Sequence, residues 1–234
     1  MDNTLRRGAE SLGLSLSNSQ VASFLKYLEL IVEWNKKFNL TAITDPNEII
    51  VKHFLDSLLM APYIQPDALL ADVGTGAGFP GIPLKILFPS VKLTLVDSLA
   101  KRVVFLQEVC RELNLTEVSA LHGRVEDIGR LSSHRARYDI VVTRAVAKMS
   151  VICEYCLPLL RISGKFIAAK GPSVNPEIEA AQNAIKLLGG RLIEVKTTSL
   201  PARDDLRTIV IIDKVNLTPM EYPRKAGIPG KSPL

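Results

Sequence analysis

The spacing of apolar side chains predicts helices in the first part of the chain. Over residues 20–40 these positions recur at helical intervals, at Phe24, Leu25, Leu28, Ile31, Val32 and Phe38. Either Asp45 or Asn47 can cap a second helix, which begins around Pro46 and ends before Pro62. Because we find no strand pattern before residue 65, we expect residues 1–65 to form a helical extension.

A different pattern follows, in which short apolar runs alternate with helical stretches. Unbroken runs such as ALLADVG, VKLTLVD, YDIVVTRA and GKFIAAKG are typical of strands buried on both faces of a parallel sheet. The stretches between them, such as AKRVVFLQEVCREL and EIEAAQNAIKLLG, have helical spacing. This alternation predicts a doubly wound α/β fold.

The last two predicted strands, RLIEVKTTSL and RTIVIID, are joined by the polar loop PARDDL. A crossover between parallel strands needs about ten or more residues, and this loop is too short to hold a helix. We therefore expect an antiparallel hairpin at this end of the sheet. The expected division is a helical extension (1–65), an α/β domain (66–215) and a basic tail without a helix (216–234).

The composition agrees with a sizeable core. Of the 234 residues, 47% are hydrophobic and 23% are charged, so global disorder is not expected. The longest apolar runs fall well short of the roughly 18 residues of a membrane span. The first residues also lack the apolar core of a signal peptide, so we expect a cytoplasmic protein without a membrane partner.

Cysteine count and spacing argue against metal and disulfide chemistry. Three cysteines are too few for a disulfide scaffold. Cys153 and Cys156 form a C-x-x-C pair, which is compatible with a redox pair or half a zinc site. The sequence has no second such pair, and its three histidines lack ligand spacing. We therefore interpret the two cysteines as core residues of an apolar helix and expect no metal.

The formal net charge of +5 is a modest excess. It permits an anionic partner, such as a nucleic acid bound through its phosphates, without requiring one. Basic pairs occur at residues 6–7, 36–37 and 101–102, and the tail YPRKAGIPGKSPL is basic as well. A scattered, solvated surface explains the charge equally well.

One stretch, LLADVGTGAGFPGIPL, carries four glycines and two prolines directly behind an apolar run. Ligands of open α/β sheets bind beyond the carboxyl ends of the strands, where the strand order reverses. If LLADVG is the central strand, Gly74, Gly76 and Gly78 form the loop at that point. Their G-x-G-x-G spacing matches neither the G-x-G-x-x-G of dinucleotide enzymes nor a P-loop. A tight turn without a ligand is the alternative.

Acidic residues at successive strand ends favour a ligand over a mere turn. Asp97 ends the next strand, 97 − 74 = 23 residues after the first glycine of the loop. A carboxylate there can accept hydrogen bonds from both hydroxyls of a ribose. Glu126 and Asp127 follow the third strand, where an adenine edge would lie. Together these positions predict a slot shaped for adenosine.

Asp72, immediately before the loop, indicates which adenosine cofactor to expect. A pyrophosphate is bound by backbone N–H groups and a helix dipole, and it does not tolerate a close carboxylate. A carboxylate suits an ammonium group instead, directly or through water. S-adenosylmethionine has an amino acid end and a sulfonium but no phosphate. The sequence therefore favours it over a nicotinamide dinucleotide.

A family resemblance rests on several motifs, in order, along nearly the whole chain. They are EWNKKFNLTAIT, HFLDSL, DVGTGAGFPGIPL, TLVDSLAKRVVFL, GRVED, VTRAVA, AAKGP and YPRKAGIPGKSPL. The chain resembles the bacterial small-subunit ribosomal RNA methyltransferase G family, also called the glucose-inhibited division protein B family. The resemblance implies a seven-stranded, mostly parallel, Rossmann-like methyltransferase sheet. It also implies methyl transfer from S-adenosylmethionine to N7 of a guanine in 16S ribosomal RNA, with that RNA or the small ribosomal subunit as partner.

The expected cofactor-binding residues come from two sources. The resemblance implies contacts by Gly74, Phe79, Val125, Glu126 and Arg144. In this scheme Val125 and Glu126 hold the adenine end, and Arg144 lies between cofactor and substrate. The spacing argument and a general methyltransferase resemblance add Asp72, Gly76, Gly78 and Asp97.

Methylation at guanine N7 needs no general base, because N7 has an exposed lone pair and no proton to lose. Catalysis then depends chiefly on positioning. As catalytic residues we expect Arg144 and Lys170, at consecutive strand ends, to grip an RNA phosphate or the O6/N7 edge of guanine, assisted by Arg124. Ordinary loop charges are the alternative for Arg144 and Lys170. Alanine at Arg144 is expected to reduce methylation and leave the fold intact.

Two further motifs are interpreted as structural. His53 and Asp56 in HFLDSL lie about one helical turn apart, so Asp56 can orient His53, although both can also act at the site. Asn39 and Thr41 in FNLTAIT are expected to cap rather than to reach the pocket. Two other functions stay open: a methyltransferase of a small molecule or protein, and a non-enzymatic RNA-binding module.

Overall fold

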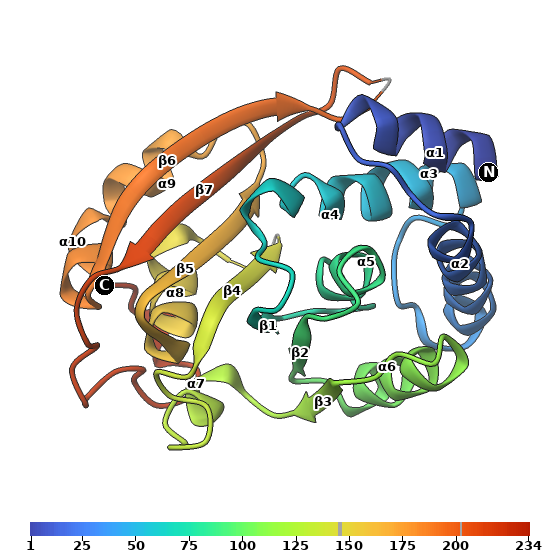
Figure 1. Ribbon diagram of the computed structural model, residues 1–234. Helices are drawn as coiled ribbons and strands as arrows, with labels where there is room; N and C mark the ends of the chain where they lie inside the picture. Colours follow the sequence, from blue (N-terminus) through green and yellow to red (C-terminus); the bar gives the residue numbers. More distant parts are fainter. Residues whose placement is uncertain (145–146, 202) are drawn as a thin grey trace.

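A sheet of seven strands runs through the middle of the molecule, with helices on both faces (Figure 1). The structure is a computed structural model that describes residues 1–144, 147–201 and 203–234. The spatial order of the strands is β3-β2-β1-β4-β5-β7-β6. Their bounds are β1 Leu69–Val73, β2 Lys92–Asp97, β3 Val118–His122, β4 Tyr138–Arg144, β5 Leu160–Lys170, β6 Gly190–Ser199 and β7 Leu206–Lys214.

The strand order reverses at β1, which pairs in parallel with both β2 and β4. The predicted doubly wound fold is therefore confirmed, and the glycine stretch follows the strand at the reversal. The last two strands form the predicted antiparallel hairpin. The position of β7 was not predicted: it lies between β5 and β6 and pairs antiparallel with both.

The described ranges contain α-helices and shorter 3₁₀ and π segments. None of these helices is long and apolar enough to cross a membrane. Before the sheet the helices are α1 Asp2–Ser11, α2 Asn18–Phe38, α3 Pro46–Ile49, η1 Ile50–Leu55, α4 Asp56–Leu58 and η2 Ala61–Tyr63. Within and after it they are α5 Gly81–Leu87, α6 Ala100–Glu112, α7 Val125–Ile128, α8 Met149–Cys156, η3 Leu157–Leu159, α9 Asn175–Ala180, α10 Gln182–Leu187 and α11 Ile228–Lys231.

Local hydrogen bonds explain where α2 and α3 begin and where α2 ends. The Ser17 hydroxyl accepts from the backbone N–H of Gln20, whose side chain accepts from the backbone of Ser17, so α2 begins in a capping box. It ends at Asn39, in the left-handed region with φ 47°. Of the two candidates around Pro46, Asp45 is the cap, because its carboxylate accepts from the N–H of Glu48.

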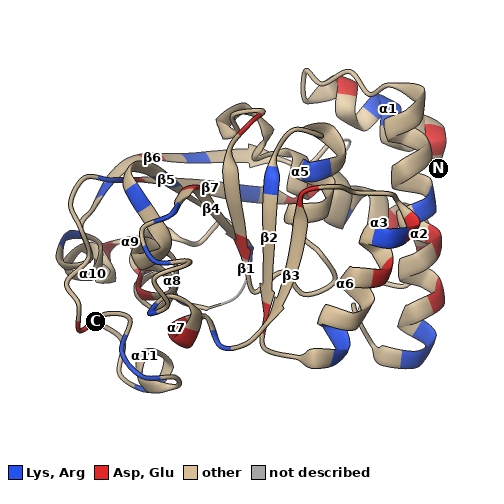
Figure 2. Ribbon diagram, turned by 60° about the horizontal axis from the view of Figure 1, so that its bottom comes forward, with Lys and Arg blue, Asp and Glu red and all other residues tan. Residues whose placement is uncertain are grey.

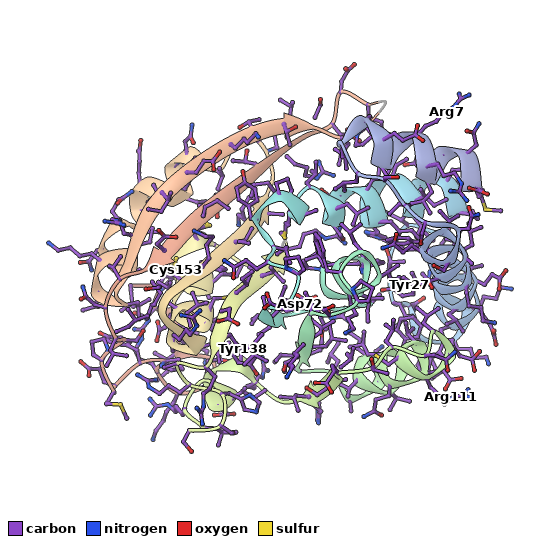
Figure 3. All side chains as sticks on the ribbon, in the orientation of Figure 1. Arg7, Tyr27, Asp72, Arg111, Tyr138 and Cys153 are labelled. Carbon is purple, nitrogen blue, oxygen red and sulfur yellow. The ribbon has the colours of Figure 1, made fainter. Side chains whose placement is uncertain are left out.

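Alternate side chains of the strands enter two separate apolar clusters. Leu70 and Ile140 pack with buried residues of the helical extension, α5 and α6, whereas Ala71 and Val141 pack with α8, α9 and α10. Residues 1–65 thus share one cluster with one face of the sheet. Cys153 and Cys156 are buried and unbonded on α8, as predicted (Cys153 is labelled in Figure 3). The described residues contain no cluster of His, Cys, Asp or Glu side chains that could hold a metal.

The basic tail lies against the domain and includes a short helix, α11, so the prediction of a tail without a helix was wrong. Gly227, with φ 84°, precedes the helix. Pro229 falls in its first turn, where a missing N–H leaves no hydrogen bond unmade. Arg224 pairs with the fully buried carboxylate of Glu154 at 2.6 Å. Tail carbonyls also accept from Arg135 Nη1 and Nη2.

Candidate active site

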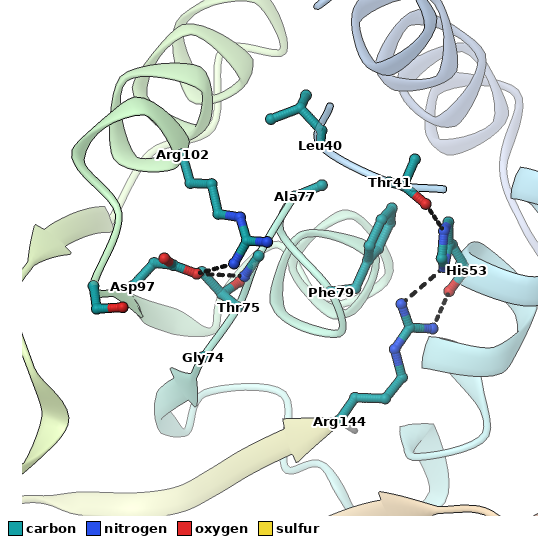
Figure 4. A pocket seen from close by; sticks show the side chains of 12 residues that line it. Leu40, Thr41, His53, Gly74, Thr75, Ala77, Phe79, Asp97, Arg102 and Arg144 are labelled. Carbon is teal, nitrogen blue, oxygen red and sulfur yellow. Dashed lines mark hydrogen bonds and ion pairs between the residues drawn. The ribbon is translucent and has the colours of Figure 1, made fainter. Parts of the chain in front are cut away.

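Two adjoining cavities lie at the carboxyl ends of β1 and β2. The larger holds about 410 Å³ and the smaller about 180 Å³. Gly74, Asp97 and Ser98 line both of them. The larger cavity, drawn in Figure 4, extends to Leu40, Thr41, His53, Thr75, Gly76, Ala77, Phe79, Arg102 and Arg144. The smaller one extends to Val73, Val96, Gly123, Arg124, Val125, Glu126, Ala147 and Tyr155.

The glycine loop brings backbone to the cavity wall. Gly74 and Gly76 have φ values of 71° and 62°, which side-chain-bearing residues rarely adopt. A Cβ on Gly76 would meet no atom within 4 Å, so the backbone there is open to a ligand. Gly78 differs from both, because it lines neither cavity. A Cβ on Gly78 would lie 2.5 Å from the hydroxyl of Tyr27, so this glycine serves packing between the loop and α2 (Tyr27 is labelled in Figure 3).

Asp97, the last residue of β2, stands where the two cavities meet, and in Figure 2 the end of β2 carries the red of acidic residues. Its Oδ1 accepts from the N–H of Leu99 at 2.9 Å. Its Oδ2 accepts from the N–H of Gly76 at 2.9 Å and from Arg102 Nη1 at 3.3 Å. An ionised carboxylate has about four lone-pair positions, so one remains. One ribose hydroxyl can donate to this remaining position. A second hydroxyl would have to displace Arg102, whose contact with Asp97 is the longest of the three.

Asp72 lies beneath the loop instead of facing a ligand. It is fully buried and lines neither cavity, and Figure 3 shows it at the centre of the molecule. Its Oδ2 accepts from the Thr75 hydroxyl and from the N–H of Gly81, both at 2.7 Å. Burial raises the pKa of Asp72 to about 7. This carboxyl ties the loop to the start of α5 and does not reach a cavity for direct contact with an ammonium group, while contact through water stays a prediction.

The smaller cavity has the mixed lining that an adenine ring requires. Val125 and Tyr155 contribute apolar surface, and Arg124 is exposed at the rim. Glu126 is buried, and its Oε1 accepts from the N–H of Gly227 in the tail at 2.9 Å. Val125 and Glu126 both line the smaller cavity, and their contact with an adenine ring stays a prediction. The Glu126 carboxylate also braces the wall against the tail, which the sequence did not predict.

Arg144 lies at the wall of the larger cavity, but its guanidinium is used within the protein. Nη1 donates to Asp56 Oδ2 at 3.0 Å and to the carbonyl of Lys52 at 3.1 Å. Nη2 lies 3.0 Å from His53 Nδ1, and the guanidinium carbon is 5.0 Å from the centre of the Phe79 ring. Burial lowers the pKa of Arg144, while Asp56 opposes that shift. These contacts hold the wall together, and contact between Arg144 and RNA stays a prediction.

His53 and Asp56 are joined through Arg144, which contacts the His53 ring (Figure 4) and also donates to the Asp56 carboxylate. The ring of His53 stacks on Phe79, with ring centres 4.5 Å apart. Its Nε2 lies 2.8 Å from the hydroxyl of Thr41. The interpretation of these motifs as structural missed that His53 and Thr41 both line the cavity. His53 belongs to the HFLDSL motif and Thr41 to the FNLTAIT motif, so the sequence contained a signal for both residues.

Lys170, the second predicted catalytic residue, lines neither cavity. Its Nζ donates to the carbonyl of Ala147 at 2.7 Å and pairs with Glu177 Oε2 at 2.8 Å. The lysine therefore anchors the chain after β4 and does not face a ligand. The predicted grip by Arg144 and Lys170 together is not assembled in this structure. Residues 145 and 146 of the VTRAVA motif lie outside the described residues.

The residues present fit S-adenosylmethionine. The open backbone at Gly76 admits a ligand without a side-chain clash, and Asp97 offers an acceptor at the junction of the two cavities. The smaller cavity has apolar walls suited to adenine, and the larger has room for the amino acid end and for a second reactant.

Comparison with known proteins agrees with this geometry. The family model described as rRNA small subunit methyltransferase G matches residues 20–206. A ribosomal RNA small subunit methyltransferase G from Alkaliphilus metalliredigens is 49% identical over 232 residues, covering 98% of this chain and 97% of the relative. The chain belongs to the rRNA small subunit methyltransferase G family. Another methyltransferase G, from Ligilactobacillus salivarius, is also 49% identical, over 98% of this chain and 97% of its own length.

Solved structures of much lower identity share the fold of this methyltransferase G family member. TYW2 from M. jannaschii, in complex with AdoMet, has a TM-score of 0.54 at 15% identity and covers 68% of this chain and 75% of its own. The YcgJ protein from Bacillus subtilis also has a TM-score of 0.54, covering 70% of this chain and all of its own. These likenesses confirm the Rossmann-like methyltransferase fold.

Proposed function

We propose that this protein transfers a methyl group from S-adenosylmethionine to N7 of a guanine in 16S ribosomal RNA, in the cytoplasm. The observation that carries the proposal is the match to methyltransferases G at 49% identity over 98% of the chain. The site supports it independently, because the open glycine backbone and Asp97 meet at the carboxyl ends of β1 and β2.

The chemistry requires little from the protein beyond placement. Bound S-adenosylmethionine supplies an electrophilic methyl carbon, which the N7 lone pair of guanine takes as the carbon–sulfur bond breaks and the electron pair returns to sulfur. N7 has no proton to lose, so the reaction needs no general base from the residues that line the larger cavity. His53 does not serve as one, because Arg144 occupies its Nδ1.

The residues of the two cavities divide the work. Gly74, Gly76 and Asp97 bind the cofactor at the junction, and Val125 lies against its adenine. Phe79, stacked on His53, provides a flat apolar wall that excludes water from the reacting atoms. Arg144 is a positioning residue that fixes this wall.

RNA contacts are proposed for the exposed cations at the rim. Arg124 is exposed at the mouth of the smaller cavity, where a phosphate of the substrate strand can reach it. Arg102 is half-buried beside Asp97 in the larger cavity. Among the described residues Arg102 has one ion pair, with Asp97, whereas Arg144 has an ion pair with Asp56 and further hydrogen bonds to Lys52 and His53.

Methyl transfer to RNA is tested with radiolabelled S-adenosylmethionine. The substrates are small ribosomal subunits, and RNA stripped from them, from a strain lacking this methyltransferase. We expect label in 16S RNA, at one guanine that primer extension maps after cleavage at N7-methylguanine. Subunits from the parent strain, already methylated, are the control. Label in protein or small molecules alone would refute the proposal, and failure of S-adenosylhomocysteine to bind at millimolar concentration would favour a non-enzymatic RNA-binding module.

A further inference from the structure

Arg144 determines which groups donate and which accept in the hydrogen bonds of the larger cavity's wall. A guanidinium has N–H donors and no acceptor. Because Arg144 Nη2 lies 3.0 Å from His53 Nδ1, that nitrogen must accept and carries no proton. Burial and the neighbouring Arg144 also lower the pKa of His53 to about 3. The ring is therefore neutral, and its single proton is on Nε2.

The proton on Nε2 fixes the next bond. Nε2 lies 2.8 Å from Thr41 Oγ1, so the histidine donates and the hydroxyl accepts. The N–H of Ile43 donates to the same oxygen at 3.1 Å. A hydroxyl has two lone pairs and one proton, and these two donors use both lone pairs. The only hydrogen bond left to the Thr41 side chain is one that it donates.

The position of Thr41 is also fixed. Its backbone N–H donates to Asn35 Oδ1 at 2.9 Å, and its carbonyl accepts from Asn35 Nδ2 at 3.0 Å. The ring of His53, whose Nε2 donates to the Thr41 hydroxyl, is held in place by stacking on Phe79. Thr41 lines the larger cavity, and within the described ranges its hydroxyl proton has no protein acceptor (Figure 4). A donor that is held so firmly at the cavity wall and has no protein acceptor is available to a ligand.

We propose that Thr41 is a specificity-determining residue, whose hydroxyl donates to an acceptor oxygen of a reactant bound in the larger cavity. This inference rests on the proposed function, which supplies two oxygens of that chemistry: the carboxylate of the cofactor's amino acid end and O6 of the target guanine. Adenine has an N6 amino donor where guanine has O6, so it would place two donors face to face. The wall therefore rejects a base, or a cofactor fragment, that lacks the acceptor.

The first experiment tests the cofactor as the source of the oxygen. Calorimetry compares S-adenosylhomocysteine with 5′-methylthioadenosine, which lacks the amino acid end, on the wild type, Thr41→Val and Thr41→Ser. If the carboxylate is the acceptor, Thr41→Val weakens S-adenosylhomocysteine about 10- to 100-fold, as expected for a hydrogen bond to a charged group, and leaves methylthioadenosine unchanged. Thr41→Ser, which keeps the hydroxyl, restores the affinity.

The second experiment tests guanine O6. Methylation rates are compared on RNA with guanine or 2-aminopurine at the target; 2-aminopurine keeps N7 and has hydrogen in place of O6. If O6 is the acceptor, the wild type loses about 3- to 10-fold in kcat/KM on the analogue, and Thr41→Val shows no such difference. Each comparison is a double-mutant cycle, so general damage to the wall by valine cancels. Thr44→Val, at an exposed position three residues on, is the matched control.

Coupling in either cycle supports the proposal and names the source of the oxygen. If the effect of Thr41→Val and the effect of the changed ligand or target base are additive in both cycles, the proposal is overturned. ¹⁵N spectra of His53 give a second readout: a proton on Nδ1 instead of Nε2 at neutral pH would also overturn it. Failure of the proposed function is distinguishable, because the wild type would then leave RNA unlabelled while the calorimetric cycle still reports on Thr41. Thermal unfolding checks that each variant is folded.

Discussion

The two sides of the larger cavity are built in different ways. On one side, Gly74 and Gly76 follow β1 and Asp97 ends β2. The N–H of Gly74 donates to the carbonyl of Val96, and the N–H of Gly76 donates to the Asp97 carboxylate. On the other side, His53 and Arg144 are 91 residues apart in sequence and meet through the Arg144 guanidinium, which contacts the ring and the carbonyl of His53. We call these the strand-end side and the Arg144 side. The first depends on the course of the backbone, whereas the second depends on a buried guanidinium.

This difference shows which side tolerates change. A backbone wall persists through most side-chain substitutions, because the sheet around it sets its geometry. A wall held by one arginine and its partners can be lost with a single residue. The following predictions test this contrast in order of decreasing effect on function.

The largest effect is expected for Arg144→Ala. The change leaves the buried Asp56 carboxylate without its closest cation, with only Arg207 at 3.2 Å from Oδ1. We expect the free energy of unfolding to fall by about 3 kcal/mol. Methylation should fall about 100-fold, since His53 and Thr41 lose their alignment. The structure thus corrects the expectation that this variant leaves the fold intact.

Urea unfolding and initial rates measure the two effects of Arg144→Ala. Arg161→Ala is the matched control, because Arg161 is half-exposed and pairs with Asp139 at the surface. Its cost is expected to stay within about 1 kcal/mol. Equal unfolding free energies for the two variants would contradict the assignment of Arg144 as the residue that holds its side of the cavity together.

The next effect is expected for Asp97→Ala on the strand-end side. The variant removes a carboxylate that binds the loop at Gly76 and offers an acceptor to a ribose hydroxyl. Hydrogen bonds to charged groups contribute about 1.5–3 kcal/mol each, so the affinity for S-adenosylhomocysteine should fall about 100-fold in calorimetry. Asp127→Ala, at an exposed position after the next strand, should bind as the wild type does. Unchanged affinity in Asp97→Ala would remove Asp97 from the site.

A smaller effect is expected for Gly76→Ala, with Gly13→Ala as its control. Both glycines have positive φ, and a Cβ added at either would meet no atom within 4 Å. Both variants therefore suffer the same backbone strain of about 1–2 kcal/mol. Only at Gly76 does the methyl group enter the cavity. Unfolding free energies should fall alike, while affinity for S-adenosylhomocysteine falls in Gly76→Ala alone. A similar loss of affinity in both would mean that strain acts without contact.

The smallest effect on binding is expected for Asp72→Asn. This variant instead changes how the free energy of unfolding depends on pH. Burial raises the pKa of Asp72 from 3.8 to about 7, so between these values the folded chain holds a proton that the unfolded chain has released. Stability from this group therefore falls as pH rises from about 4 to about 7 and is level above. The asparagine keeps the acceptor for Gly81 and removes this slope. Urea unfolding across that pH range measures it; parallel curves for the two proteins would contradict the raised pKa.

The strand-end side could be predicted because its information is local. An apolar strand followed by G-x-G-x-G, and a carboxylate at the end of the next strand, place Gly74, Gly76 and Asp97 together once the sheet is parallel. The fold followed from the same periodicity, including the terminal hairpin. The exception is Gly78, whose spacing matched but whose neighbour is Tyr27.

The Arg144 side could not be predicted, because its contacts join distant segments. Sequence placed Arg144 and Lys170 at strand ends, but it did not show that Asp56 and Glu177 would pair with them. A charge at a strand end looks the same whether it faces solvent or a buried partner. Asp72 illustrates the same limit, since a strand ending in Asp does not reveal whether the carboxyl points into the cavity or under the loop.

The hydrogen bond from Gly227 to Glu126 has a consequence for the order in which the protein is made. Glu126 belongs to the smaller cavity, and its brace comes from a residue that follows it by 101 positions. Translation delivers the first strands of the sheet long before that brace. A nascent chain without Gly227 has the glycine loop but lacks the hydrogen bond that braces Glu126, so we expect tight cofactor binding only once the tail has packed against the domain.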